Sequence, residues 1–413
     1  MREMKESNIS WVGKIPCSWK VEKNKHCFQL EKNIVGDNND KFELLSLTKK
    51  GIIKKDESST GGKVPESFET YQSVKEGQLV MCLFDLDVSA VFSGLSNYDG
   101  MISPAYKVYN CNKIIDKNYA KYWFECCFDG RKYKAYSKSL RYVVNTEDFG
   151  PIEILLPPKE EQEKIAEFLD KKITEIDSVI DKTKETINDY KMYKQSYINK
   201  IITKGLEQNK EKKDSNIDYI GKCPKDWKII KLKFATKIRN EKYEEKYGAI
   251  EYFALENIES ESGKFINTDN IYDREGSIIC NKDDVVFGKL RPYLAKVYKV
   301  KNLSCCSSEF AVFYDFKGKV DYLKYLLLSY GFIKIVDAST YGTKMPRVNI
   351  DFIKNMLIPL PNTETQERIA SHLNNKCEEI DILIENKQRI IEELEQYKKS
   401  LIYEYVTGKK EVV

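Results

Sequence analysis

The sequence predicts an α+β protein in which two mixed α/β domains are joined by two long helices that form an antiparallel intramolecular coiled coil. Three observations support this fold class. A heptad pattern of apolar residues runs from position 166 to position 201, the pattern recurs 204 residues later, and a mixed α/β segment precedes each copy. An internal repeat of this kind indicates that both halves of the chain share one architecture.

The first long helix is predicted by apolar residues that recur at alternating steps of three and four. The pattern starts at Ala166 and ends at Ile201, with polar interruptions at Thr183 and Lys194. No Gly or Pro interrupts it, so we expect one helix of about 45 residues, roughly 65–70 Å long. A helix of that length needs a partner of equal length to cover its apolar stripe.

The partner helix is predicted in the same chain. The pattern recurs from Ala370 to Tyr405, and Lys387 and Lys398 interrupt it at the same two steps. These interruptions either set the register of the helix pair or mark where it opens towards another subunit. The apolar residues predicted to form the coiled-coil seam are Leu169, Ile173, Ile176, Ile180, Ile187, Tyr190, Leu373, Ile380, Ile384, Ile391, Leu394 and Leu401.

The repeat divides the chain into four expected segments. They are a first mixed domain over 1–157, a central long helix over 158–205, a second mixed domain over 206–361 and a distal long helix over 362–413. Each half opens with a Gly-Lys-x-Pro turn and a Trp three residues after the Pro, which marks the start of each repeat.

The first mixed domain is predicted from short apolar runs separated by turn-forming residues. The expected strands are 42–48, 77–84, 88–92, 105–109 and 148–156, with a helix over 119–128. Four tyrosines in this part alternate with apolar residues and are expected in the core, namely Tyr98, Tyr106, Tyr119 and Tyr122. The second domain repeats the outline with strands at 252–255, 283–288 and 310–314 and a helix over 320–330.

Composition narrows the class of protein. The chain has 413 residues, a net charge of only +4, and 11 cysteines of which no two have CxxC spacing. With two histidines, a structural zinc site is not expected. The odd number of cysteines and the lack of a signal peptide or a long apolar window predict reduced, buried thiols in a cytoplasmic protein with no membrane segment.

The motifs of several enzyme classes are missing. The sequence has no GxxxxGK[ST], no GxGxxG after a predicted strand, no Asn-Pro-Pro-aromatic tetrapeptide and no HExxH. These absences argue against a nucleotide hydrolase, an amino-methyltransferase of DNA and a zinc protease. A nuclease built from Asp, Glu and Lys alone remains open, although no compact acidic cluster ends in ExK on a predicted strand.

Two basic segments that precede the long helices, at 134–145 and 339–349, are the better candidates for function. A third, at 288–293, forms a basic turn between predicted strands. Arg and Asn suit the edges of guanine and adenine, and Lys, Ser and Thr suit phosphate. The predicted DNA contacts are Lys138, Arg141, Tyr142, Asn145, Lys289, Arg291, Thr343, Lys344, Arg347 and Asn349. The alternative is that Arg141 and Arg347 pair with carboxylates of their own domain.

Taken together, the chain resembles the specificity subunit of Type I restriction-modification systems. The resemblance covers the whole chain and rests mainly on two Leu-Pro-…-Gln-…-Ile-Ala-x-x-Leu starts of the long helices, at 156–169 and 360–373. Ile176-Asp177, Ile380-Asp381 and Thr203-Lys204-Gly205 add to it. The second copy departs slightly, with Asn362 where the first has Pro158.

This resemblance implies that two target recognition domains each read half of a bipartite, asymmetric site in double-stranded DNA. It implies that the helices set the gap between half-sites and dock two methyltransferase subunits, and that restriction motor subunits join the full complex. It further implies a non-catalytic chain without its own cofactor or metal, because S-adenosylmethionine, ATP and Mg would bind the partner subunits. The alternatives are a two-headed coiled-coil scaffold that does not bind DNA, and the recognition part of a fused restriction-methylation enzyme.

Overall fold

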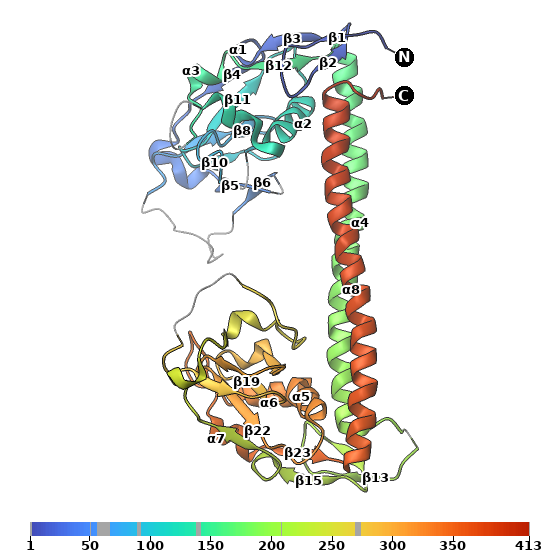
Figure 1. Cartoon of the computed structure of the whole chain (residues 1–413). Coiled ribbons are helices and arrows are strands. Elements are labelled where there is room, and N and C mark those ends of the chain that lie inside the picture. Colours follow the sequence, from blue (N-terminus) through green and yellow to red (C-terminus); the bar gives the residue numbers. More distant parts are fainter. Residues whose placement is uncertain are drawn as a thin grey trace. The chain divides into compact units, whose positions relative to one another are not determined.

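The structure is a computed structural model that describes residues 2–49, 51–55, 67–88, 92–137, 142–207, 209–268 and 274–412. The chain forms two compact units, which are Met1–Lys182 with Ile390–Val413 (unit 1) and Thr183–Arg389 (unit 2). Each unit contains one mixed domain and one part of each long helix, α4 (Lys159–Lys204) and α8 (Thr363–Val406), as Figure 1 shows. The predicted fold class, with two mixed domains joined by two long helices, is confirmed.

Unit 1 is built around a four-stranded antiparallel sheet with the strand order β4-β11-β8-β9. Its strands are β1 (Met4–Glu6), β2 (Lys14–Pro16), β3 (Lys20–Lys23), β4 (Phe28–Glu31), β5 (Leu45–Thr48), β6 (Gly51–Lys54), β7 (Gln72–Val74), β8 (Leu79–Met81), β9 (Ser93–Leu95), β10 (Gly100–Ile102), β11 (Lys107–Cys111) and β12 (Glu153–Leu156). Its helices besides α4 and α8 are α1 (Asn24–Cys27), α2 (Lys117–Phe128) and α3 (Thr146–Phe149), with 3-10 turns η1 (Gly36–Lys41) and η2 (Asp129–Tyr136).

Unit 2 repeats this topology with a four-stranded antiparallel sheet in the order β16-β22-β19-β20. Its strands are β13 (Lys212–Asp214), β14 (Lys222–Pro224), β15 (Lys228–Lys231), β16 (Lys237–Arg239), β17 (Glu251–Phe253), β18 (Ile278–Cys280), β19 (Val285–Gly288), β20 (Val297–Lys299), β21 (Ser304–Cys306), β22 (Phe310–Tyr314) and β23 (Leu357–Leu360). Its other helices are α5 (Val320–Leu328), α6 (Tyr330–Ala338) and α7 (Ile350–Asn355), with 3-10 turns η3 (Leu232–Phe234), η4 (Glu245–Tyr247), η5 (Leu255–Asn257) and η6 (Pro292–Leu294).

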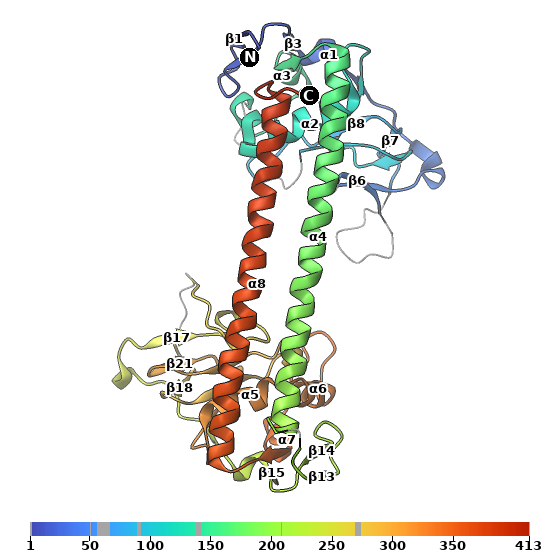
Figure 2. The same ribbon diagram turned by 90° about the vertical axis from the view of Figure 1, so that its right-hand side faces the viewer.

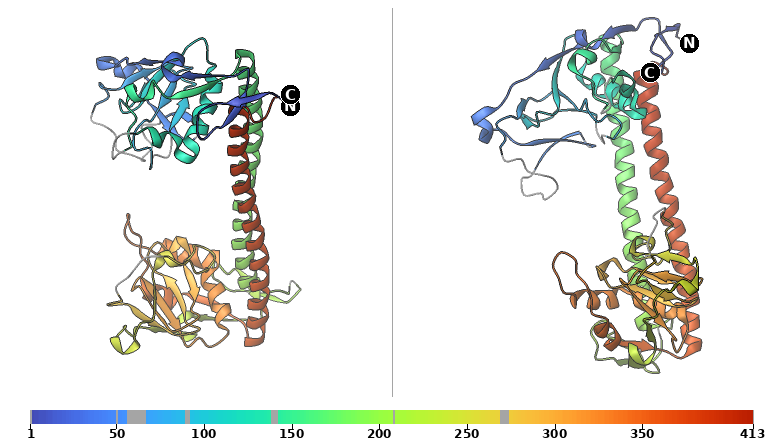
Figure 3. Two further views of the ribbon diagram at one scale, coloured as in Figure 1. Left: turned by 45° about the horizontal axis from the view of Figure 1, so that its top comes forward. Right: turned by 60° about the vertical axis from the view of Figure 1, so that its left-hand side comes forward.

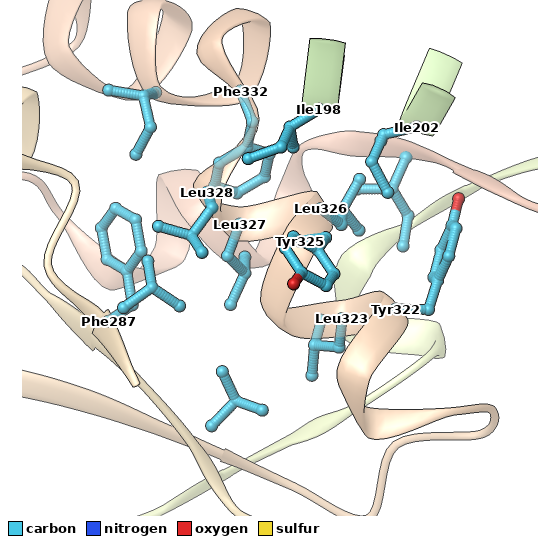
Figure 4. Close-up of a cluster of buried hydrophobic side chains, with 14 of the residues drawn as sticks. Ile198, Ile202, Phe287, Tyr322, Leu323, Tyr325, Leu326, Leu327, Leu328 and Phe332 are labelled. Carbon is cyan, nitrogen blue, oxygen red and sulfur yellow. The ribbon is translucent and has the colours of Figure 1, made fainter. Parts of the chain in front are cut away.

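The central sheet of unit 2 is covered on both faces, which explains the unbroken apolar run of β19. Successive side chains of a strand point to opposite faces. Val285 and Phe287 therefore pack in one core with α5 and α4, whereas Val286 packs in a second core beneath β18 and β21. Figure 4 shows the first core, in which Ile198 of α4 lies among the leucines of α5.

Each domain has a pair of buried tyrosines on its own helix, and at least one of each pair bonds to a long helix. In α2, the hydroxyl of Tyr119 donates to backbone carbonyls of Leu155 and Val406, and that of Tyr122 donates to Asp170. The expectation that Tyr119 and Tyr122 lie in the core is confirmed, because both are buried. Tyr106 is half-buried, and the same expectation is wrong for Tyr98, whose residue is 38% exposed beside the ammonium of Lys54.

The tyrosines of unit 2 repeat these contacts from α5. The hydroxyl of Tyr322 donates to the carbonyl of Pro359 at 2.8 Å, and that of Tyr325 donates to Asn374 at 2.8 Å. Burial raises the pKa of Tyr322 well above its ordinary value, so the hydroxyl stays protonated and keeps its role as a donor. The bonds of Tyr122 to Asp170 and of Tyr325 to Asn374 are therefore equivalent links from each domain to a long helix, whereas Tyr322 bonds to β23.

The starts of the long helices are held by two buried glutamines in equivalent positions. Gln162 donates to the carbonyl oxygens of Pro157 and Ile114 and accepts from the backbone N–H of Asp116. Gln366 in unit 2 makes the corresponding bonds, donating to Pro361 and accepting from the N–H of Lys319. Each glutamine thus joins a long helix to the strand before it and to the segment that begins α2 or α5.

The strand predicted over 148–156 is confined to β12 (Glu153–Leu156), because Thr146–Phe149 form α3. Two further local predictions are wrong. Val88 lies in a turn and Phe92 in no strand, residues 89–91 lie outside the described residues, and the strand of this region is β9 (Ser93–Leu95). The apolar side chain of Phe92 instead packs against Phe124 and Tyr133 in the core. Gly94 lies within β9 and allows close packing, since a Cβ there would lie 2.8 Å from Leu47.

The second correction concerns the helix predicted to end at Tyr330. The helix α5 ends before Ser329, whose backbone is extended, and a further helix, α6, follows directly. The break brings Gly331 against α4, where its N–H donates to Asn199 at 2.9 Å. A Cβ on Gly331 would lie 2.9 Å from that same Asn199 side chain. This contact between residues far apart in the sequence has no local signal.

All 11 cysteines are free, and nine are buried, while Cys17 is exposed and Cys111 is half-buried. In the part of the chain that the structure describes, no group of three or more His, Cys, Asp and Glu side chains is placed to hold a metal ion. None of the described helices combines the length and the apolar character that crossing a membrane requires.

Candidate nucleic-acid interface

In unit 2, two of the predicted binding segments come together as one surface, which we call the turn–loop pair. It consists of the turn 288–293 after β19 and the loop 339–349 after α6. The backbone N–H of Val348 donates to the carbonyl of Lys289 at 3.0 Å, and that of Arg291 donates to Pro346 at 2.7 Å. Tyr341 and Arg347 exchange two further backbone hydrogen bonds within the loop. Residues 55 and 59 positions apart are thereby fixed side by side.

The cationic side chains of the turn–loop pair lie at its surface. Arg291 is exposed and has a left-handed backbone with φ of 49°, and Lys344 is exposed next to Thr343. Among the described residues, no carboxylate forms an ion pair with Arg291 or Lys344. Exposed cations on a hydrogen-bonded backbone suit contact with an anionic polymer. The predicted contacts at Arg291, Thr343 and Lys344 remain predictions.

Arg347 has a partner within the domain. Its guanidinium forms an ion pair with the carboxylate of Glu309, which lies just before β22, and 41% of the Arg347 side chain remains exposed. This is the pairing that the sequence analysis gave as the alternative to a DNA contact. The two roles are compatible, because a guanidinium has five N–H donors and one carboxylate can orient it while other donors face outward.

Asn349 is exposed and has a structural task. Its side-chain oxygen accepts from the backbone N–H of Asp351 at 2.8 Å and so caps the N-terminus of α7. The cap uses the acceptor of the amide and leaves its NH₂ group for other contacts. The contact with adenine predicted for Asn349 stays a prediction, and only the NH₂ group of the side chain is left to make it.

The corresponding segment of unit 1 is described in part. Lys138 and Arg141 lie outside the described residues. Tyr142 is half-buried with a left-handed φ of 47°, and the ammonium of Lys134 lies 4.0 Å from the centre of its ring. Asn145 is exposed directly before α3, without a cap from its side chain. The DNA contacts predicted for these residues of unit 1 remain predictions.

The turn–loop pair has a counterpart in unit 1. There, the backbone N–H of Val144 donates to the carbonyl of Leu83 at 2.9 Å, as Val348 does to Lys289 in unit 2. Two residues beyond the accepting carbonyl, Asp85 has φ of 48° and Arg291 has φ of 49°. The two domains therefore use the same backbone arrangement at this place.

The side chains on the two equivalent turns have opposite charge. The turn of unit 1 carries Asp85 and Asp87, whereas that of unit 2 carries Lys289 and Arg291. The DNA contacts predicted from the sequence include no residue of the acidic turn, because the prediction rests on basic segments. The sequence does contain a signal for this turn, since both turns follow an apolar strand of the central sheet, β8 or β19. Different charges on one backbone arrangement are expected for domains that bind different ligands.

The residues of the predicted coiled-coil seam are buried or half-buried along the two long helices. Leu169, Ile176, Ile180, Ile187, Leu373, Ile380, Ile391 and Leu401 are buried, and Ile173, Tyr190, Ile384 and Leu394 are half-buried. In unit 2, α4 and α8 run side by side, and the Tyr197 hydroxyl lies 2.7 Å from a ring nitrogen of His372 across the contact (Figure 2).

Two of the three lysines that interrupt the seam, Lys194 and Lys398, form equivalent ion pairs. In unit 2, the ammonium of Lys194 lies 2.7 Å from Asp381, and both side chains are largely buried, at 8% and 17% exposed. In unit 1, Lys398 lies 2.8 Å from Asp177, where the side chains are 21% and 47% exposed. Each aspartate is one of the Ile-Asp pairs on which the resemblance rested. These lysines pair within the chain.

A second apolar stripe on the long helices is exposed. Residues at one further heptad position are Val179, Tyr193, Leu383, Ile390 and Tyr397, which are separated by multiples of seven within each helix, and Val179 and Tyr193 match Leu383 and Tyr397 by the shift of 204. Their exposed fractions range from 44% at Leu383 and Ile390 to 54% at Tyr397. Exposed apolar residues that recur at a fixed helical position indicate a surface for another protein.

The ends of unit 1 are tied to its long helices. The guanidinium of Arg2 pairs with Glu161 at the start of α4 and with Glu411 behind the end of α8. Figure 3 shows both termini at this place.

Comparison with known proteins identifies the family. The profile of the Type I restriction modification DNA specificity domain matches residues 98–189 and 224–396, more than half of the chain. The MjaVIII specificity subunit of Methanocaldococcus jannaschii is 28% identical over 355 residues, which cover 81% of this chain and 80% of that protein. The MjaX specificity subunit of that organism, described as putative, is 28% identical over 320 residues, covering 75% and 68%.

Solved structures share the fold. A chain of a type I R-M system, studied for its complex assembly and conformational transition, has a TM-score of 0.70 at 14% identity and covers 96% of this chain and 99% of its own. The HsdS subunit of Thermoanaerobacter tengcongensis has a TM-score of 0.51 at 14% identity and covers 96% and 98%. The profile match, the related sequences and the shared fold agree, and the chain belongs to the family of specificity subunits of Type I restriction-modification systems.

Proposed function

We propose that this chain is the DNA-recognition subunit of a Type I restriction-modification complex and that each mixed domain reads one half of a bipartite, asymmetric site in double-stranded DNA. The observation that carries this proposal is that both domains share the same turn–loop backbone. The turn carries acidic side chains in the first domain and basic side chains in the second. A repeated backbone with different side chains suits two domains that bind the same polymer at different base sequences.

In the second domain, the proposed contacts divide by chemistry. Arg347, held by Glu309, is suited to guanine, because a fixed guanidinium can donate two parallel hydrogen bonds to O6 and N7. Lys344 and Thr343 at the exposed part of the loop suit backbone phosphates, which fix the position of a protein on the duplex without selecting a sequence. In the first domain, Lys138, Arg141, Tyr142 and Asn145 are proposed for the equivalent task.

The long helices are proposed to set the gap between the half-sites. The buried seam and its two ion pairs support this role, because a helix pair with a defined register has a defined length. The exposed stripe at Val179, Tyr193, Leu383, Ile390 and Tyr397 is proposed to dock two methyltransferase subunits. The repeat supplies equivalent positions on both helices, as two copies of one partner require.

Catalysis is proposed to belong to the partners. Methylation would use S-adenosylmethionine bound by the methyltransferase subunits, and DNA cleavage would use ATP and Mg bound by the restriction motor subunits. This chain would contribute recognition and position. The proposal agrees with a sequence that contains neither the P-loop motif nor the dinucleotide-binding motif.

A gel-shift assay combined with methylation mapping tests the proposal. The purified chain, with and without its methyltransferase partner, is titrated with a random pool of duplexes, and methylated positions are mapped in cells that express the complex. We expect one bipartite, asymmetric motif and DNA binding that depends on this chain. Binding to the partner without any dependence on DNA would favour a protein scaffold, and methylation by the chain alone would favour a fused enzyme.

Substitution of Arg347 gives a more local prediction. Arg347→Ala removes the proposed base contact and should weaken binding by about 1–3 kcal/mol while relaxing the base preference at one position of the second half-site. Methylation mapping of the variant measures this. Equal loss at both half-sites would contradict base readout by Arg347, and Glu309→Gln serves as a control that keeps a hydrogen-bond acceptor beside the arginine.

A further inference from the structure

A cavity of about 120 Å³ adjoins the turn–loop pair of unit 2. Its lining includes Arg239, Asn240, Lys289, Phe310 and Lys354. Since a liquid water occupies about 30 Å³, the space would hold an anion of several heavy atoms. Three cations and one amide on a partly apolar wall form a site rich in hydrogen-bond donors, which favours an anionic ligand.

The cations of this cavity differ in whether their charge is already compensated. Arg239 is bound by Asp284, with Nε–Oδ2 and Nη2–Oδ1 distances of 2.8 and 3.2 Å. Lys354 pairs with Asp351 at 2.9 Å. Lys289 is half-buried, and among the described residues no carboxylate forms an ion pair with its ammonium. Burial lowers the pKa of Lys289, against the opposing effect of Glu309. An anion would compensate this desolvated charge.

Glu309 connects the cavity to the turn–loop pair. One of its carboxylate oxygens pairs with Arg347, and the other, Oε2, is buried without a hydrogen-bond partner in the described part of the chain. The carbonyl of Glu309 accepts from the backbone N–H of Lys289 at 2.9 Å. One carboxylate thus acts on two cations, Arg347 and Lys289, and leaves the three groups with a net charge of about +1.

We propose that this cavity receives one phosphate group of the DNA backbone beside the second half-site, with Lys289 as its ion-pair partner and Asn240 as a hydrogen-bond donor. Glu309 is a positioning residue, because it holds Lys289 and Arg347 in fixed relation. The inference rests on the proposed function and adds to it that phosphate anchoring and base reading in this domain come from two residues that both contact Glu309, Lys289 through its backbone and Arg347 through its side chain.

The chemistry of Lys289 favours phosphate over a base edge. An ammonium is a compact point charge without the planar fork that recognises guanine, whereas the guanidinium of Arg347 has that fork. Lys289 should therefore contribute affinity and salt dependence without base preference. Each neutralised phosphate contributes about −0.9 to the slope of log Kobs against log salt concentration.

Methylphosphonate scanning tests the site with the full chain in complex with its methyltransferase subunits. Each backbone phosphate of a duplex that carries the mapped site is replaced in turn by an uncharged methylphosphonate. For the wild type, we expect one phosphate beside the second half-site at which binding falls about tenfold, the scale of one charge-assisted hydrogen bond. In Lys289→Met, replacement of that phosphate should have no further effect on binding. The slope of log Kobs against log salt concentration should become less negative by about 0.9.

Three controls separate the possible outcomes. Lys334→Met removes an exposed cation of α6 in the same unit and should leave the scan unchanged, and Lys289→Arg should keep most of the sensitivity. An unchanged scan in a folded Lys289→Met variant, checked by thermal unfolding, overturns the inference. Inorganic phosphate that stabilises the wild type but not Lys289→Met, together with a flat scan, would assign a free-anion site and also overturn it. Failure of the wild type to bind any duplex would contradict the proposed function itself.

Discussion

At the scale of single residues, two of the four polar interruptions of the coiled-coil seam, Lys194 and Lys398, are explained by their partners. A lone lysine at a seam position would bury an uncompensated charge, which costs several kcal/mol. Lys194 and Lys398 avoid this cost by pairing with Asp381 and Asp177, residues that are equivalent by the same shift of 204. Of the two roles that the sequence left open, the contacts favour a role in register.

The two ion pairs differ in burial, which gives a matched pair of variants. Asp381→Asn should destabilise the protein by about 3 kcal/mol, because it leaves the largely buried ammonium of Lys194 without a counter-charge. The equivalent Asp177→Asn should cost at most about 1 kcal/mol, since the side chain of Asp177 is 47% exposed. Urea unfolding followed by circular dichroism measures both. Equal losses would show that burial does not govern these pairs.

At the scale of elements, both long helices end on the first turn of a domain. Gly205 follows α4 and packs on Trp227, and Gly408 follows α8 and packs on Trp19. Both glycines have positive φ, of 75° and 69°, as is common behind a helix C-terminus. The Gly-Lys-x-Pro and Trp motif marks the start of each repeat in the sequence. The C-terminus of α4 thus packs on the motif of the second repeat, and the C-terminus of α8 packs on that of the first.

Alanine at the two glycines should have unequal effects. Each substitution forces a left-handed backbone on a residue with a Cβ, which costs about 1 kcal/mol or more. At Gly408, the Cβ would in addition lie 2.5 Å from Pro16, whereas at Gly205 the nearest atom is 3.1 Å away on Trp227. We expect Gly408→Ala to lower the melting temperature more than Gly205→Ala. The reverse order in calorimetry would contradict this packing.

At the scale of the whole molecule, the chain consists of two units with equivalent central sheets, each of which contains parts of both long helices. Because each unit contains part of both helices, the lengths of α4 and α8 have to match each other. A change of length in one helix alone would leave seam positions of the other unpaired. This is why the proposed ruler requires both helices to change together.

Insertion of one heptad into both α4 and α8 tests the proposed ruler. Seven residues add about 10 Å of helix, close to the length of three base-pair steps of about 3.4 Å. The gap of the DNA site should lengthen by about three base pairs while the bases read in each half-site stay the same. Methylation mapping measures both properties. An unchanged gap between the two half-sites, in a folded and active complex, would contradict the proposal that the helices set this gap.

Sequence patterns predicted the repeat and the long helices well. Heptad spacing and the absence of Gly and Pro were sufficient for α4 and α8, and apolar runs located β19 and β22 to within two residues. The strand near Phe92 and the helix break at Ser329 were missed, because the positions of Gly94 and Gly331 depend on side chains that are distant in the sequence, Leu47 and Asn199.

By itself, the sequence determined the two-fold repeat, the paired long helices and the family, because heptad periodicity and repeated motifs are local properties of the chain. Only the tertiary structure decided which polar groups meet, as in Lys194 with Asp381 and Arg347 with Glu309. It also decided that the turn after β19 lies against the loop after α6. Such contacts join residues from separate elements, so they follow from packing in three dimensions and leave no periodic signal in the sequence.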